Sequence, residues 1–193
     1  MNIRRSLIAL ALSIAAVSSL AETKAYRFAD VPWHSSPSEV SKRLEAMGYS
    51  KLEQVQNPAF NVYMFSGKSG DDPFGGIAYF APDDKLLKIA LFFDETPVHA
   101  RFRYEALKGS LTKKFGKPAV MNEYFDQPYH DGDEEQAFSV DKAHFISVYR
   151  GDPIADSATV AISEKGTQVT VSYEAADWPA EVERIKKQHN AGF

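Results

Sequence analysis

Two segments of the chain gather the residue types that catalysis or metal binding requires. The first runs from Ser66 to Gly76 and combines adjacent aspartates with glycines and a phenylalanine. The second runs from Asp126 to Glu135 and combines a tyrosine and a histidine with clustered carboxylates. The candidate binding residues in these segments are Asp71, Asp72, Phe74, Tyr129, His130, Asp131, Asp133 and Glu134.

These residues suit several uses. Clustered carboxylates suit Ca²⁺, which takes about six to eight oxygen ligands, although Asp131-x-Asp133 lacks the other ligands of a calcium loop. His130 next to Asp131 or Asp133 suits a general base with an orienting acid. The simplest interpretation is a solvated acidic loop between two strands. Its aromatic and glycine residues would then offer an adaptable contact surface to another protein.

The rest of the chain contains no complete catalytic motif. It has no Gly-x-Ser-x-Gly, no His-Glu-x-x-His, no phosphate-binding loop and no dinucleotide fingerprint. No two of the five histidines stand at metal-ligand spacing on one predicted helix. We therefore expect no cofactor and favour a non-enzymatic binding or inhibitory module. A small hydrolase built on His130 and its neighbouring acids, and a carrier of a small apolar ligand, remain the alternatives.

The stretch VPWHSSP, residues 31–37, places a histidine beside a tryptophan and two serines. Its pattern nevertheless predicts the start of a helix. Ser36 and Glu39 have the spacing of a capping box, and Pro37 occupies the first helical position. Apolar residues then follow at helical spacing up to Gly48. His34 is expected in a turn, exposed or half-exposed.

A second helix is predicted from Thr96 to Phe115, and a third from Asp177 to residue 190. Between them the apolar period changes from 3.6 to 2, which is typical of strands. The predicted strands are 61–66, 77–80, 86–93, 119–126, 136–140, 143–150, 157–163 and 168–174.

Strands joined by short turns predict an α+β fold, with a mainly antiparallel sheet and helices packed on one face. Ser-Pro or Thr-Pro opens each of the first two helices, and Gly48 or Gly116 closes it. This repetition suggests a tandem helix-plus-sheet duplication with halves 28–94 and 95–174, followed by the C-terminal helix 177–190. Residues 22–193 are expected to form a single domain.

The first 21 residues have the pattern of a signal peptide. Arg4 and Arg5 precede an apolar run from Leu7 to Val17, and Ser19 and Ala21 supply the small residues of a cleavage site. Eleven apolar residues are too few for a membrane span, which needs about 20. The mature protein is therefore expected in the periplasm, or alternatively secreted.

The composition of the chain limits the kinds of partner that the protein can bind. Without the predicted signal peptide the chain has 20 basic and 26 acidic side chains, a net charge of −6, which argues against a nucleic-acid partner. The chain has no cysteine, which excludes disulfides, thiolate catalysis and a lipidated N-terminal cysteine. The expected partner is another envelope protein. Its identity and the oligomeric state do not follow from the sequence.

Two motifs of this sequence resemble motifs of known proteins. Phe28-x-x-Val31-Pro32-Trp33-x-x-Ser36, followed by a short helix, resembles the start of many small exported bacterial proteins of unknown function. The segment from Tyr104 to Pro118 is similar to their second helix. Most of them have glycine where this chain has His34. The layout of two helix-plus-sheet units also resembles the secreted β-lactamase inhibitor protein and related envelope domains, and it implies binding to other proteins.

We predict that the mature protein begins at Glu22, because Ser19-Leu20-Ala21 is the well-placed cleavage site after the apolar run. Intact-mass measurement of periplasmic protein checks this prediction. A mass that retains residues 1–21 would contradict it.

Overall fold

The computed structural model describes residues 26–150, 156–163 and 165–190, so the predicted signal peptide lies outside the described residues. Eight strands form one open antiparallel sheet in the order β1-β2-β3-β4-β8-β7-β6-β5. The strands are β1 (Glu53–Val55), β2 (Asn61–Ser69), β3 (Asp72–Phe80), β4 (Leu86–Asp94), β5 (Val120–Phe125), β6 (Ala143–Arg150), β7 (Ser157–Ile162) and β8 (Gln168–Glu174). The helices are α1 (Pro37–Ala46), α2 (Pro97–Phe115), α3 (Glu134–Ser139) and α4 (Trp178–Asn190). The prediction of an α+β fold with an antiparallel sheet is confirmed.

The sheet is built from two meanders. In each half a helix is followed by four strands, and the sheet order is symmetrical about the pairing of β4 with β8. The second half differs by α3, which lies between β5 and β6. A common origin of the two halves stays a prediction.

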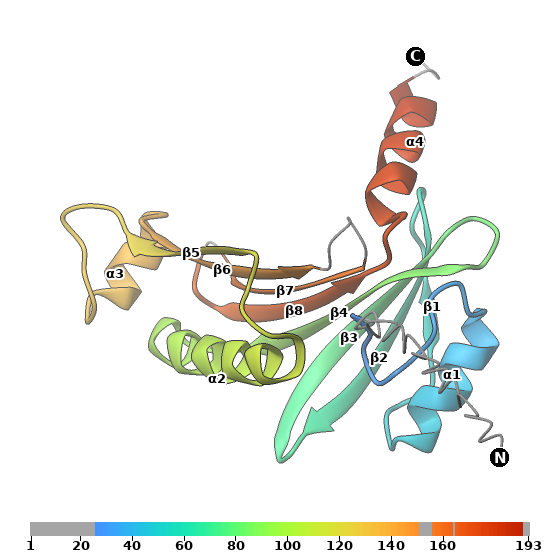
Figure 1. Cartoon of the computed structure of the whole chain (residues 1–193), viewed down its shortest axis with the longest axis horizontal. Coiled ribbons are helices and arrows are strands. Elements are labelled where there is room, and N and C mark those ends of the chain that lie inside the picture. The colour runs from blue at the N-terminus through green and yellow to red at the C-terminus, as the bar shows by residue number, and fades with distance from the viewer. Residues whose placement is uncertain (1–25, 151–155, 164, 191–193) are drawn as a thin grey trace, which may run out of the picture.

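The core lies between one face of the sheet and the helices α1 and α2. Val40 and Leu44 of α1 and Tyr104 and Leu111 of α2 are buried in the same apolar cluster. That cluster also takes in alternate residues of the strands, such as Phe65, Phe74, Ile89, Val160 and Val171. We call this side of the sheet the core face and the other side the open face. Figure 1 shows α2 under the β5–β8 half of the sheet, with α4 rising from the other side.

The first turn of α1 confirms the predicted cap. The backbone N–H of Ser36 donates to the Glu39 carboxylate over 2.8 Å, and the N–H of Glu39 donates to Ser36 Oγ over 3.4 Å. Pro37 is the first helical residue. Thr96 takes the equivalent N-cap position of α2, but its side chain makes no cap hydrogen bond.

His34 lies in a turn, as predicted, with its side chain 49% exposed. Its φ is +65°, a left-handed conformation that glycine adopts without steric cost. Glycine at this position would remove the steric cost of that conformation. The His34 ring also meets the Asp177 carboxylate over 2.9 Å, so it links this turn to the start of α4.

Two predictions of local structure are wrong. Residues 136–140 were expected as a strand, but they fall in and after α3, where Ala137 and Phe138 are buried. The packing of Phe138 against Gly166 explains this, because a Cβ added at Gly166 would lie 2.6 Å from the Phe138 ring.

The segment from Ser66 to Gly76, expected as a loop, belongs mostly to the β2–β3 hairpin. Its glycines mark close aromatic contacts instead of a flexible chain. A Cβ at Gly67 would lie 2.4 Å from the Tyr49 ring, and one at Gly76 would lie 2.3 Å from the Phe65 ring. Tyr49 and Phe65 therefore pack directly on the strand backbone.

The His34 geometry leads to a prediction about stability. His34→Gly should be more stable than His34→Ala by about 1 kcal/mol, because alanine keeps the cost of the left-handed backbone and glycine does not. Both variants lose the exposed contact with Asp177, which contributes at most about 1 kcal/mol. Urea unfolding of the two variants measures the difference. Equal stabilities would contradict the backbone explanation.

Candidate functional site

The structure places the residues of the first predicted site in structural roles. Phe74 is 5% exposed and belongs to the core, so it does not offer a contact surface. Asp72 pairs with Arg103 of α2 at 2.6 Å, and this hydrogen bond lowers the pKa of Asp72. Asp71 is exposed in the β2–β3 turn. Of these three residues, Asp71 alone projects freely into solvent.

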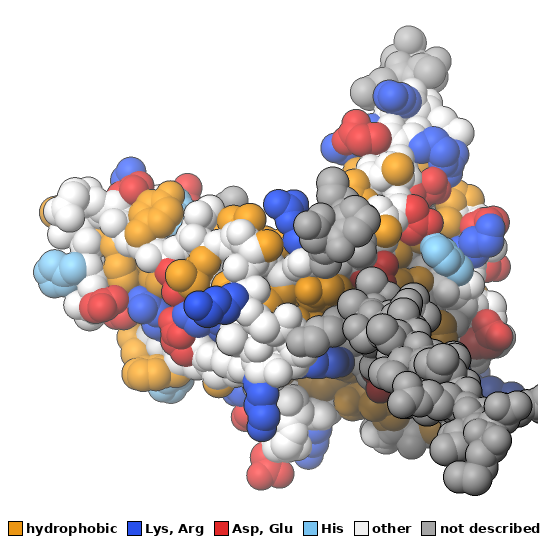
Figure 2. Space-filling model, in the orientation of Figure 1, with side chains coloured by type: hydrophobic (Ala, Val, Ile, Leu, Met, Phe, Trp, Pro, Cys, Tyr) orange, Lys and Arg blue, Asp and Glu red, His pale blue; other side chains and the backbone are white. Residues whose placement is uncertain are grey.

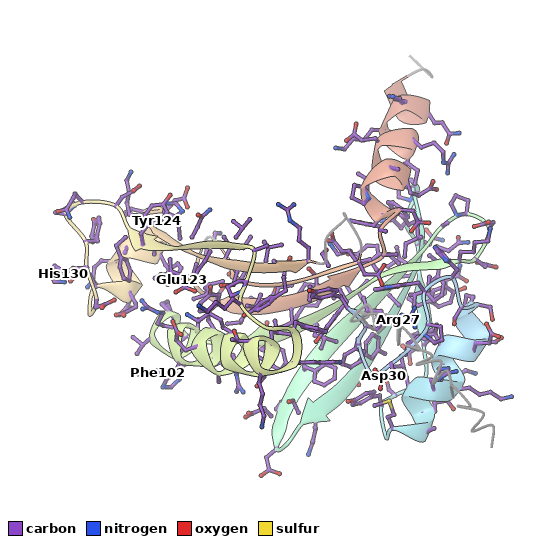
Figure 3. The ribbon with its side chains drawn as sticks, in the orientation of Figure 1. Arg27, Asp30, Phe102, Glu123, Tyr124 and His130 are labelled. Carbon is purple, nitrogen blue, oxygen red and sulfur yellow. The ribbon has the colours of Figure 1, made fainter. Side chains whose placement is uncertain are left out.

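The residues of the second predicted site mostly hold their own loop together. Asp133 accepts the backbone N–H of His130 over 3.0 Å, and its carboxylate lies 3.1 Å from His130 Nδ1. Glu134 accepts the N–H of Gly132 over 3.1 Å. Tyr129 packs partly buried against the core. The His130 side chain itself is 77% exposed and projects from the tip of the loop (Figure 3).

Two arginines of α2 each bind one of the two predicted segments. Arg101 donates to Asp131 over 3.2 Å, while Arg103 donates to Asp72 and also to Glu95 over 2.9 Å. Residues two apart on a helix point about 200° away from each other. The two predicted loops are therefore fixed on opposite sides of α2, and their residues do not meet in one site.

The geometry supports neither metal binding nor catalysis at these loops. No group of three histidine, aspartate or glutamate side chains in the described part of the chain is placed to hold a metal ion. His130 has an acidic partner in Asp133, but both lie on an open loop whose hydrogen bonds serve the loop itself. The calcium and hydrolase interpretations thus gain no support from the structure.

A buried polar cluster joins β5 and β6 to α2. The Tyr104 hydroxyl donates to Glu123 Oε1 over 2.7 Å and lies 2.8 Å from Ser147 Oγ. Lys108 reaches both Glu123 oxygens at 2.9 Å. Because Ser147 and Tyr104 are fully buried, no substrate reaches the serine. The cluster fastens the edge strand β5 to the helix beneath it.

Burial and hydrogen bonding have opposite effects on the pKa of Glu123. Burial by itself raises the pKa of a carboxyl group. The hydrogen bonds from Lys108 and Tyr104 outweigh burial and hold the pKa of Glu123 below its ordinary value. Glu123 is therefore ionised at neutral pH and compensates the charge of Lys108.

The open face carries the feature that sequence reasoning missed. Cross-strand pairing lines up two neighbouring rows of residues that each run across seven strands, from β2 to β5. The first row is Met64, Ile77, Ala90, Ser172, Thr159, Val148 and Val120. The second row is Ser66, Gly75, Phe92, Thr170, Ala161, Ile146 and Asn122. Neither row contains a charged residue, and we call the two rows together the uncharged belt.

In the first row of the uncharged belt, small residues lie at the centre and larger ones towards the ends. Ala90 and Ser172, where the two halves meet, are buried in its floor. Met64 at one end is 47% exposed, and Val120 at the other end is 38% exposed. The first row is therefore least exposed where the two halves of the sheet meet.

Charged residues border the belt on both long sides. On one side Lys88 of β4 pairs with Glu174 of β8 at 2.7 Å, and the Lys88 ammonium lies 5.1 Å from the centroid of the Trp178 ring. On the other side Asp94 accepts a hydrogen bond from Gln168 over 3.0 Å. α4 thus meets the open face at the border of the belt. An apolar centre with a polar rim is the arrangement of protein interfaces.

No helix in the described part of the chain is long and apolar enough to cross a membrane. Comparisons of the chain with family models, with curated proteins and with solved structures found no match. The resemblance to small exported proteins stays a prediction.

The Glu123 cluster leads to a prediction about pH. Because the pKa of Glu123 is lower in the folded protein, its ionisation stabilises the fold above the unfolded pKa of about 4.3. That stabilisation is lost as the pH falls through the folded pKa. Glu123→Gln should therefore lower the melting temperature at pH 7, and the deficit should shrink below about pH 4.

Thermal unfolding at a series of pH values measures this effect. Glu105→Gln is the matched control, because Glu105 also contacts Lys108 but is 44% exposed. The control should change the melting temperature less at pH 7. A Glu123→Gln deficit that stays constant from pH 7 to pH 3 would contradict the assignment.

Proposed function

We propose that the protein is an exported, non-enzymatic binding module of the cell envelope that holds another protein on its open face. The uncharged belt is the observation that carries this proposal. α1 and α2 cover the core face, and α4 meets the open face at its border through Trp178, which packs 5.6 Å from the Tyr79 ring. The signal-peptide pattern predicted for residues 1–21 supports the location.

The chemistry of the belt favours a protein partner. Nucleic-acid binding depends on basic side chains that meet phosphates, and neither row of the belt contains one. Half-buried side chains of the belt, the aliphatic Ile146 and Val148 in β6 and the aromatic Phe92 in β4, suit the apolar centre of a protein interface. The hydroxyl groups of Thr159 and Thr170 add hydrogen-bonding groups to the same surface.

The core gives the alternative of a small-ligand carrier less support. The space between the sheet and the helices is filled by packed aromatic rings. The Tyr26 and Phe115 rings stack with their centroids 4.5 Å apart, and the Tyr49 and Phe74 rings meet edge to face at 5.5 Å. A carrier would need a cavity where these rings lie.

A single charge placed in the belt tests the proposal. Thr159 lies in the middle of the first row, in β7, where an arginine extends into solvent without disturbing the core. Thr159→Arg should abolish the capture of the protein's envelope partner, because a buried unpaired charge opposes association. The measurement is quantitative capture from envelope extract by the wild-type protein and by the variant.

Ser110→Arg is the matched control, because it adds the same charge at an exposed position of α2, on the other side of the sheet. The control should capture the same partner as the wild type. If Thr159→Arg binds as much as the wild type does, the open face is not the binding surface. A bound lipid in native mass spectrometry, without a captured protein, would favour the carrier.

A further inference from the structure

The two edges of the sheet differ in how well they are protected. β1 forms one edge with three residues and begins with the charged Glu53. β5 forms the other edge with six residues, VMNEYF, without proline or lysine. Natural proteins usually protect sheet edges with short strands, lysine or proline. β5 has none of these three protections, and its one charged residue, Glu123, is held by Lys108 on the core face.

Exposed apolar side chains gather on β5. Val120 is 38% exposed, Met121 is 57% exposed and Tyr124 is 50% exposed. Figure 2 shows hydrophobic side chains at the surface over this strand. The Tyr124 ring packs at a tilt against His144 of β6, with centroids 4.9 Å apart, which holds it over the open face. The edge therefore offers both unpaired backbone groups and apolar contact area.

The pairing of β5 with β6 determines which backbone groups are free. Asp126 N–H donates to the Lys142 carbonyl, which places the even-numbered residues of β5 in hydrogen-bonded pairs with β6. Met121 and Glu123 then point their N–H and C=O groups away from the sheet. An added strand must hydrogen-bond to these odd-numbered residues.

We propose that β5 pairs antiparallel with β5 of a second copy of this chain, about a two-fold axis through Asn122. This inference does not depend on the proposed function. In this register Val120 lies opposite Tyr124 of the second copy, and Met121 lies opposite Glu123 of the second copy. A β-branched residue opposite an aromatic residue is a favourable cross-strand pair.

The alternative registers are worse. The pairing of odd-numbered residues allows a two-fold axis only at a single residue. Centring it on Glu123 would place two carboxylates directly opposite each other, which is destabilising. Centring it on Met121 or Tyr124 shortens the overlap of the strands. The register centred on Asn122 keeps nearly the full strand length of about 20 Å and pairs two neutral amides.

Charge favours the antiparallel direction. The residues before β5 are basic, with Lys113 and Lys114 in the last turn of α2 and Lys117 just after it. The residues after β5 form the acidic segment that begins at Asp126. Antiparallel pairing brings the basic end of one copy to the acidic end of the other. A parallel pairing would place like charges together, so the charges select a symmetric dimer.

Sedimentation of the full chain over a range of concentrations tests the dimer. Five paired residues bury less than the roughly 800 Å² per partner of a standard interface, so we expect a concentration-dependent dimer that forms by about 100 μM. A protein that stays monomeric at that concentration overturns the proposal.

A charge swap at the two-fold axis tests the register. Asn122→Asp and Asn122→Lys each place like charges opposite each other and should each weaken the dimer about tenfold. An equimolar mixture should form a heterodimer at least as stable as the wild-type dimer, measured by native mass spectrometry. This rescue also shows that both variants are folded.

Gln54→Asp and Gln54→Lys on the opposite edge strand are the matched controls, and they should dimerise like the wild type. Dimers that persist in both Asn122 variants overturn the proposal. If the Gln54 variants abolish the dimer, the proposal is also overturned, because the contact would then lie on β1. A wild-type chain that stays monomeric yet captures an envelope partner would leave the proposed function standing, so the two ideas fail separately.

Discussion

The pairing of β4 with β8 is the constraint on which the rest of the structure depends. Seven residue pairs, from Lys88 with Glu174 to Asp94 with Gln168, join two four-stranded meanders into one sheet. The core-facing residues of this seam, such as Ile89, Phe93 and Val171, are almost completely buried. Because the seam fixes the register of both halves, it also aligns the rows of the open face across strands that are distant in the sequence. The uncharged belt exists only as a consequence of this pairing.

The polar residues that look most like a catalytic site are used to fix α2. Arg101 lies 4.2 Å from the centroid of the Phe145 ring and holds the acidic loop, while Arg103 holds the β2–β3 hairpin. Two acidic partners raise the pKa of Arg103 further above its already high value. Asp72 and Asp131, two of the side chains that could do chemistry, are thus engaged in ion pairs within the protein.

Most of the fold could be predicted from the sequence because its signals are local. The capping box of Ser36 and Glu39, the apolar spacing in α2 and the tight turns between strands each act within a few residues. The wrong predictions arose where distant contacts decide. Phe138 packs under Gly166, and Tyr49 and Phe65 pack on Gly67 and Gly76. The local sequence of α3 and of the long β2–β3 hairpin therefore does not reveal the structure that these segments adopt. The belt was missed for the same reason, since alternation reveals that a strand has two faces but not which residues line up across a sheet.

The open face and the unprotected edge meet at β5, and this geometry links the two proposals physically. Val120 and Asn122 are the last residues of the two rows and also belong to the edge strand. Pairing of two edges about Asn122 would continue the second row directly into the same row of the second copy, because both copies then present the open face on one side. The second row would double in length without any new charge, while the first row of each copy would meet Tyr124 of the other copy. A partner that contacts both halves of such a belt would bind the dimer more tightly than the monomer, and by linkage its binding would strengthen the dimer to the same extent.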